Sequence, residues 1–319
     1  MSNTQLLVIG LDGYESSISD KLIAEGRMPH LAALLGDAAR FSLDHGLDRY
    51  TGLAWEHVAS GLDPQRSGRW SAVAFDPSTY HAVQSETDSK PALSGLGLKP
   101  VVFDAPYFDL AVAPDVRGLV NWGAHDPGVA SMARPDSLLD EVTERFGPYP
   151  AANFIYGFTW PNADRTERAG QLLAQAVEQR ARISRWLFTE RLADWDVAMV
   201  VVAELHSVIE PMWHGVDPSH PLHHHPSAEA ARRGIEGVYE KLDAMIGMLG
   251  EAAPDARLAV FSMHGMGPNN ADVPAMVLLP ELMHRSAFGQ THFDAPRAWR
   301  EADHGVPLLD PDEKWERAI

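Results

Sequence analysis

Side chains that can bind a metal ion or transfer a proton follow the apolar runs of this chain. The apolar run at residues 5–11 ends at Asp12, and a further predicted strand at residues 257–263 is followed by His264. Apolar runs without alternation are typical of strands buried on both faces of a parallel sheet. Because the carboxyl ends of such strands share the edge where α/β proteins bind ligands, we expect these side chains to lie close together. On its own, Asp12 before a glycine is more typical of a turn or a helix cap.

Two further apolar runs end in similar side chains. Residues 100–104 end at Asp104, and residues 196–203 run into Glu204, His206 and Glu210. His206 and Glu210 are four residues apart, so on a helix both side chains would point from one face and could coordinate one metal ion. An imidazole nitrogen with a carboxylate oxygen suits zinc or manganese. The spacing alone does not show whether His206 and Glu210 bind a metal ion or only form a structural contact with each other.

Thr51 is a candidate of a different kind. It opens a helical pattern at residues 51–59, where it would make a good N-cap. The same position would place its hydroxyl beside the N–H groups that favour an anion at a helix start. A hydroxyl bound to a metal at such a site is an activated nucleophile. Composition alone favours the cap.

Composition limits the classes of partner. The chain has 319 residues, 45% of them apolar, which predicts a globular protein with a sizeable core. A net charge of −18 argues against binding to a nucleic acid duplex or an anionic membrane surface. There is no cysteine, so any metal must be held by carboxylates and by some of the 15 histidines. No signal peptide or membrane span is recognisable, which predicts a cytoplasmic protein; a homo-oligomer is left open.

Elements that would position these residues alternate along the chain. Strands are expected at residues 5–11, 100–104, 196–203 and 257–263, with a further candidate at 273–279. Helices are expected as two short elements within 18–35, and at 51–59, 137–146, 165–192 and 228–249, whereas 64–68, 214–227 and the chain beyond Pro280 read as irregular. This alternation predicts an α/β three-layer sandwich with a mainly parallel central sheet.

Two motifs in the first part of the chain carry a family resemblance. The first is VIGLDG at residues 8–13, followed by Gly26 and by MPHL at residues 28–31. The second is the segment 51–68, in which Thr51 is followed in register by Trp55, Ser60-Gly61, Pro64 and Gly68. In this order they resemble the alkaline phosphatase superfamily, in its type I phosphodiesterase/nucleotide pyrophosphatase branch. Ser60 and Ser67 stand where that branch has Thr and His.

Two later motifs extend the resemblance, with exchanged metal ligands. In residues 203–221, alignment on Trp213 puts His206 at the family's Asp position and Glu210 at its His position. A competing register pairs Glu210 with His214. In FSMHGM at residues 261–266, His264 is kept and Met263 replaces the family's metal-binding Asp.

The resemblance implies a hydrolase that uses one or two divalent ions, zinc before manganese. One ion would be held by Asp12, Thr51 and His264, and the other by His206, Glu210 and a later histidine. For that last ligand we prefer His304 over His284 and His292. Alternatively, the domain, residues 1–319, is shortened at its C-terminal end and lacks a third ligand for the second ion. Thr51 would attack the phosphorus or sulfur of a small phosphate or sulfate ester.

Residues that could shape the substrate pocket come from the same motifs and from a loop at 121–126. They are Trp55, Trp122, His125, Trp213 and His214. The alternatives are ordinary packed tryptophans and a solvated polar loop, and the latter is favoured for residues 223–225. Because Met263 removes a ligand, a catalytically silent binding or scaffold protein is the second hypothesis. Phosphonate cleavage or group transfer on the same fold is the third.

Overall fold

A six-stranded sheet forms the centre of the molecule, in the order β6-β5-β4-β7-β1-β8. The computed structural model describes residues 5–43, 53–79, 81–84, 87, 89–123, 130–154, 162–220, 222–265 and 279–292. The strands are β1 Leu6–Leu11, β4 Pro100–Phe103, β5 Arg117–Val120, β6 Met132–Arg134, β7 Val197–Val202 and β8 Arg257–Ser262. All neighbours are parallel except β5 and β6. The predicted mainly parallel sheet is confirmed.

The strand β1 lies in the middle of this sheet, which explains its apolar sequence. Leu6 is in register with Val197 of β7 on one side and with Arg257 of β8 on the other. Successive side chains point to opposite faces, so Leu7 and Ile9 enter one core cluster while Val8 packs against the other. Both faces are therefore buried, as the lack of alternation predicted.

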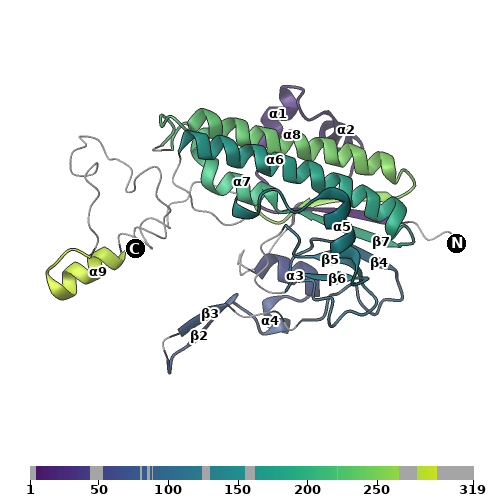
Figure 1. Ribbon diagram of the computed structural model, residues 1–319, viewed down its shortest axis with the longest axis horizontal. Helices are drawn as coiled ribbons and strands as arrows, with labels where there is room; N and C mark the ends of the chain where they lie inside the picture. The colour runs from purple at the N-terminus through teal and green to yellow at the C-terminus, as the bar shows by residue number, and fades with distance from the viewer. Residues whose placement is uncertain are drawn as a thin grey trace.

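The larger helical layer covers one face of the sheet (Figure 1). It contains α1 Ser16–Ala24, α2 Pro29–Asp37, α5 Leu138–Phe146, α6 Ala163–Trp186, α7 Glu204–Met212 and α8 Ala228–Ala252. The two long helices α6 and α8 lie side by side over the sheet (Figure 1). They approach closely at two glycines, because a Cβ added to Gly170 would lie 2.6 Å from the Cα of Gly234.

The other face is covered by shorter elements. These are α3 Ala54–Ser60, α4 Pro64–Ser67 and the segment after β4, whose Tyr107, Phe108 and Leu110 join the second core cluster. The molecule thus has three layers, as predicted. In the described part of the chain no helix is both long and apolar enough to cross a membrane.

Several elements differ from the predicted ones. The expected loop at 64–68 contains α4, because Asp63 caps it by accepting the N–H of Arg66 and Pro64 occupies its first turn. The expected helix at 165–192 changes to a π turn, η4 Leu187–Arg191, after Trp186. A hairpin of β2 Val73–Asp76 and β3 His81–Gln84 was not predicted.

The C-terminal part was also predicted incompletely. The chain beyond Pro280 was expected to be irregular, but it contains α9 Leu279–Phe288, which has no buried residue in the structure. Its helical period is carried by exposed apolar side chains, among them Leu282 and Met283. Residues 273–278 of the candidate strand at 273–279 lie outside the described residues.

Candidate functional site

Asp12 is the centre of a polar cluster at the carboxyl edge of the sheet. Its backbone N–H continues the β1 ladder by donating to the carbonyl of Val202 over 3.2 Å. Its carboxylate Oδ2 lies 3.2 Å from Nδ1 of His206, and its Oδ1 accepts the indole N–H of Trp55 over 2.9 Å. The same Oδ1 is 3.9 Å from Nε2 of His264. Asp12 is 7% exposed, so these groups replace most of its contact with water.

The strand order explains why these groups meet. The strand β1 lies between β7 and β8, and each of the three is followed by one of the polar residues. Asp12 follows β1, His206 lies in the first turn of α7 after β7, and His264 lies two residues after the end of β8. The carboxyl ends of parallel strands thus bring together side chains that are more than 50 residues apart in sequence.

The helix α7 adds a second carboxylate to the cluster. Oε2 of Glu210 lies 4.0 Å from Nε2 of His206, which is four residues earlier on the same helix. The imidazole of His206 is therefore placed between two carboxylates, with Nδ1 toward Asp12 and Nε2 toward Glu210. In metal sites, a carboxylate on one nitrogen of a histidine commonly orients the other nitrogen toward the ion.

In this cluster, Asp12 and His206 each favour the charged form of the other. Burial by itself raises the pKa of Asp12, but the hydrogen bond and charge of His206, followed by Trp55 and His264, outweigh it and lower the pKa. Burial by itself lowers the pKa of His206, but Asp12 and Glu210 outweigh it and raise the pKa. The carboxylate is thus kept ionised in a buried position, which is the state that a cation requires.

A glycine allows α7 to approach the end of β1. Gly13 has φ +65°, a left-handed conformation that disfavours side chains. A Cβ at Gly13 would lie 2.9 Å from the Cα of His206. The Asp-Gly pair therefore makes the turn and also sets the distance between Asp12 and His206.

The carboxylate oxygens and imidazole nitrogens of this cluster are ligands that suit a divalent cation, and they lie in two pairs. Asp12 with His264, and His206 with Glu210, each supply one carboxylate and one imidazole. Among the described residues no group of three or more His, Asp or Glu side chains is arranged to hold one ion. The third ligands suggested by the sequence, Thr51 and His304, lie outside the described residues.

Trp55 connects the cluster to the second layer. Its helix α3 begins at Ala54, and Leu53 rather than Thr51 is the N-cap residue. The Trp55 ring is buried, with its centroid 5.8 Å from that of Phe261. Met263, for which the sequence resemblance predicted the position of a metal ligand, packs against the same apolar cluster as Trp55. Trp55 thus contacts a proposed ligand directly, while its ring belongs to the core.

Of the loop 121–126, the structure describes residues up to Gly123. The N–H groups of Trp122 and Gly123 both donate to the carboxylate of Asp104, over 2.7 and 2.9 Å. The Trp122 ring packs against Phe103 and Tyr149, with centroid distances of 5.4 and 5.0 Å. His125 lies outside the described residues.

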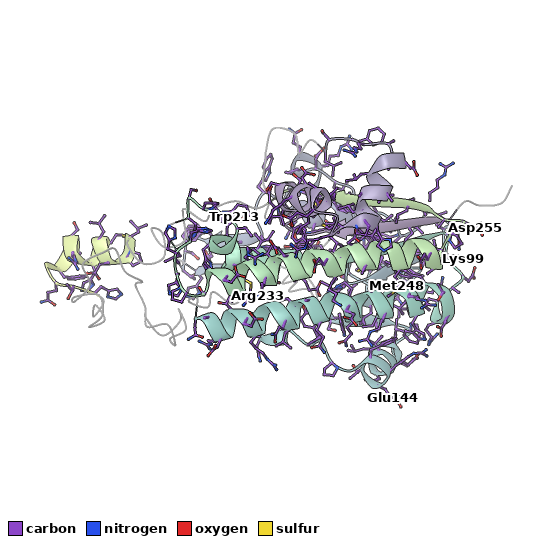
Figure 2. The ribbon with its side chains drawn as sticks, turned by 90° about the horizontal axis from the view of Figure 1, so that it is seen from above. Lys99, Glu144, Trp213, Arg233, Met248 and Asp255 are labelled. Carbon is purple, nitrogen blue, oxygen red and sulfur yellow. The ribbon has the colours of Figure 1, made fainter. Side chains whose placement is uncertain are left out.

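Trp213 and His214 lie beyond the end of α7, in η5 Trp213–Gly215. The indole N–H of Trp213 donates to Asp217 over 3.0 Å, and its ring lines a cavity of about 350 Å³ together with residues of α1 and α8. Figure 2 shows Trp213 near the opposite end of the two long helices from Lys99 and Asp255, which precede β4 and β8.

His214 is buried in a group of histidines. Its Nε2 lies 2.9 Å from Oγ of Ser227, and its ring centroid is 5.9 Å from that of His220. Burial, followed by the neighbouring histidines, lowers the pKa of His214 to about 4. At neutral pH it is therefore an uncharged residue of the interior.

The two remaining strand-end carboxylates have a different partner. Asp104 after β4 and Glu204 after β7 both pair with Arg180 of α6, each over 2.8 Å, and all three side chains are fully buried. Arg180 was missed because a lone Arg in a helix is usually exposed. A signal existed, since Arg180 lies on the apolar stripe of α6 that also carries Leu173 and Ile183.

Comparison with solved structures agrees with this architecture. The phosphonoacetate hydrolase of Sinorhizobium meliloti 1021 in complex with phosphonoacetate is similar, with a TM-score of 0.53 and 15% identity over 92% of this chain. The same enzyme in complex with phosphonoformate gives a TM-score of 0.51 and 15% identity over 90% of this chain. The present chain covers 63% of the length of each. The fold is that of the alkaline phosphatase-like α/β proteins.

A sequence model of a protein family makes the assignment more specific. The model of type I phosphodiesterase/nucleotide pyrophosphatase matches residues 6–312. The chain belongs to this family. No protein of curated function has a significant sequence match to it.

Proposed function

We propose that this protein is a metal-dependent hydrolase of small phosphate esters, with phosphodiesters as the favoured class. The observation that carries the proposal is the convergence of Asp12, His206 and His264 from the ends of three adjacent strands. Membership of the type I phosphodiesterase/nucleotide pyrophosphatase family supports this chemistry.

The proposed metal ligands are the two pairs together with residues inferred from the sequence. Asp12, His264 and Thr51 would hold one divalent ion, and His206, Glu210 and His304 the other; zinc suits these donors best, and manganese is the alternative. Such ions, when bound, neutralise the charge on phosphoryl oxygens and favour ionisation of a nearby hydroxyl. Trp55 holds the carboxylate of Asp12 in place from the opposite side to His206.

Thr51 is the proposed nucleophile. Its hydroxyl oxygen would form a bond to phosphorus while the bond to the leaving alcohol breaks, and the alcohol takes up the proton. Water would then cleave the threonine ester, restore the hydroxyl and release the phosphate product. The substrate is a small molecule, because the acidic chain offers no general surface for a nucleic acid duplex. We place the protein in the cytoplasm and treat residues 1–319 as one domain.

The test is hydrolysis of bis(4-nitrophenyl) phosphate by the purified protein with Zn²⁺ or Mn²⁺. We expect turnover that EDTA abolishes, and that Thr51→Ala lowers by about 100-fold or more. Thr143→Ala is the matched control, since Thr143 is an exposed residue of α5 whose hydroxyl donates to the carbonyl of Leu139 in its own helix. 4-Nitrophenyl phosphate, 4-nitrophenyl sulfate and phosphonoacetate serve as competing substrates. Absence of turnover on all four contradicts the proposal.

A silent binding protein on the same fold is the second candidate. Met263 favours it, because this side chain packs into the apolar cluster and carries no charge for a metal. The substitution Met263→Asp distinguishes the two candidates. Activity that appears only in this variant supports the silent protein, whereas turnover by the natural chain that is lost in Thr51→Ala excludes it.

A further inference from the structure

A second cluster of charges lies beside the proposed metal centre, at the neighbouring strand ends. Arg180 is fully buried in α6. Its Nη1 donates to Oδ2 of Asp104 over 2.8 Å, while its Nε and Nη2 donate to the two oxygens of Glu204 over 3.0 and 2.8 Å. The pair with Glu204 is thus a two-pronged one, which fixes direction as well as distance. We call Arg180, Asp104 and Glu204 the Arg180 triad.

The triad ties three segments of the chain together. Asp104 follows β4, has φ +56° and accepts the N–H groups of Trp122 and Gly123 after β5. Glu204 is the first residue of α7, after β7. The guanidinium of Arg180 also lies 5.3 Å from the ring centroids of both Phe103 and Trp122, in the geometry of cation–π contacts. One side chain of α6 therefore holds the ends of β4, β5 and β7.

Stability does not explain such a cluster. Taking charged groups out of water is costly, and apolar side chains of the same volume often stabilise a fold as well or better. A buried charge cluster is better explained by the precise placement that its hydrogen bonds enforce. The element that it places is α7, which carries His206 two residues after Glu204 and Glu210 one turn later.

The helix α7 needs such an anchor. It has only nine residues, its N-cap residue Ala203 makes no side-chain cap, and Pro211 interrupts its last turn. Short helices without caps are marginal by themselves. The bond from Arg180 to Glu204 fixes the first residue of α7, where a helix lacking a cap would fray.

We propose that Arg180 is a positioning residue of the proposed metal centre: by holding Glu204 against Asp104 it sets the start of α7, and so places His206 of this helix against Asp12. The proposal rests on the proposed function for its consequence in metal binding. The placement of α7 itself does not depend on that function. Arg180 acts through Glu204 and Asp104, which are its ion-pair partners, and is not one of the proposed metal ligands.

The test uses Arg180→Met combined with Glu204→Gln, which removes both charges of the pair and leaves Asp104 with its two backbone donors. The matched control is Arg191→Met combined with Glu141→Gln. That pair has the same two-pronged geometry, with distances of 2.6 and 2.9 Å, but joins α5 to η4. Hydrogen exchange of the peptide 203–212 is measured without metal, and Mn²⁺ affinity is measured below the unfolding transition.

In the Arg180 double variant we expect exchange in the peptide 203–212 to be about tenfold faster, with exchange in α8 unchanged. We expect Mn²⁺ affinity to fall by about 10–100-fold, the range for loss of a group that supports metal ligands. The control variant should match the natural chain in both. If the double variant does not fold, Glu204→Gln alone takes its place, with a smaller change in the same direction expected.

The outcomes distinguish the role of Arg180 from the proposed metal-dependent function. Unchanged exchange in the peptide 203–212 overturns the role of Arg180, whether or not the protein binds metal. Faster exchange with unchanged Mn²⁺ affinity also overturns it, because a purely structural pair gives that result. A natural chain that binds neither Zn²⁺ nor Mn²⁺ contradicts the proposed function, and the exchange experiment on metal-free protein then decides on the placement of α7.

Discussion

The indole N–H of Trp55 donates to Oδ1 of Asp12 over 2.9 Å and so joins the helix α3 to the end of β1. The bond crosses from one covering layer of the sheet to its carboxyl edge. His206 occupies the other carboxylate oxygen of Asp12. The orientation of the buried carboxylate of Asp12 is thus fixed by one partner from each side of the sheet, as expected for the metal ligand that we propose.

Removing this indole donor is expected to destabilise the protein. Trp55→Phe keeps most of the ring in the core but leaves Oδ1 of the buried Asp12 with one donor fewer. We expect a loss of about 1–3 kcal/mol in the free energy of unfolding at pH 7, and a rise in the pKa of Asp12. Urea denaturation measures the first effect. Trp70→Phe is the control, since Trp70 is 51% exposed; equal losses in the two variants would contradict the assigned bond.

The turn at Gly13 gives a prediction about the geometry of the proposed metal centre. Gly13 and Gly26 have similar positive φ values, +65° and +74°, but a Cβ on Gly13 would meet the backbone of His206 whereas Gly26 has nothing within 4 Å. Alanine at either position should cost about 1–2 kcal/mol of backbone strain. Only Gly13→Ala should also weaken Mn²⁺ binding, by tenfold or more, as measured by calorimetry. Equal Mn²⁺ affinity in the two variants would show that this close approach is unimportant.

The buried His214 predicts a dependence of stability on pH. Its pKa is about 4 in the folded chain, against 6.5 for the unperturbed group. The unfolded chain therefore binds more protons between these values, so the contribution is fully present above pH 6.5 and is lost as the pH falls toward 4. The loss should reach up to about 3 kcal/mol. His220 and His225, whose pKa values are also lowered by burial, act in the same direction.

The variant His214→Gln isolates this effect. Glutamine does not titrate and can still reach the hydroxyl of Ser227, the partner of Nε2 of His214. Urea unfolding at a series of pH values should show a shallower fall between pH 6.5 and 4 in the variant than in the natural chain. Parallel curves would mean that His214 is not buried as described.

The long and strongly patterned elements of the fold could be predicted from the sequence. The strands β1 and β7 are continuous apolar runs, β8 is a mostly apolar segment between Arg257 and Ser262, and α8 begins at Ala228 as its period indicated. Shorter elements escaped because their formation depends on neighbours. The strand β5 has only four residues, one of them Gly118 with φ +130°, and β6 has three that pair with it. Such segments carry too few residues for a period to be recognised.

The sequence predicted which residues form the candidate site better than it predicted the contacts between them. The position of Asp12, His206 and His264 after strands of one parallel sheet was enough to expect them together. It gave no sign of the bond from Trp55 to Asp12, which depends on how α3 crosses the second face. Nor could it separate Asp104 and Glu204 from the metal candidates, because their partner Arg180 comes from a helix that is distant in sequence. The roles of Thr51, His125 and His304 stay predictions.

The most direct test is anomalous diffraction from crystals grown with Mn²⁺, recorded on both sides of the manganese absorption edge. The account predicts a peak in contact with His206 and Glu210, and a second beside Asp12 and His264 if both ions bind. Maps with no anomalous peak at any of these four side chains, from one crystal exposed to millimolar Mn²⁺ and another exposed to millimolar Zn²⁺ and recorded at the zinc edge, would contradict it.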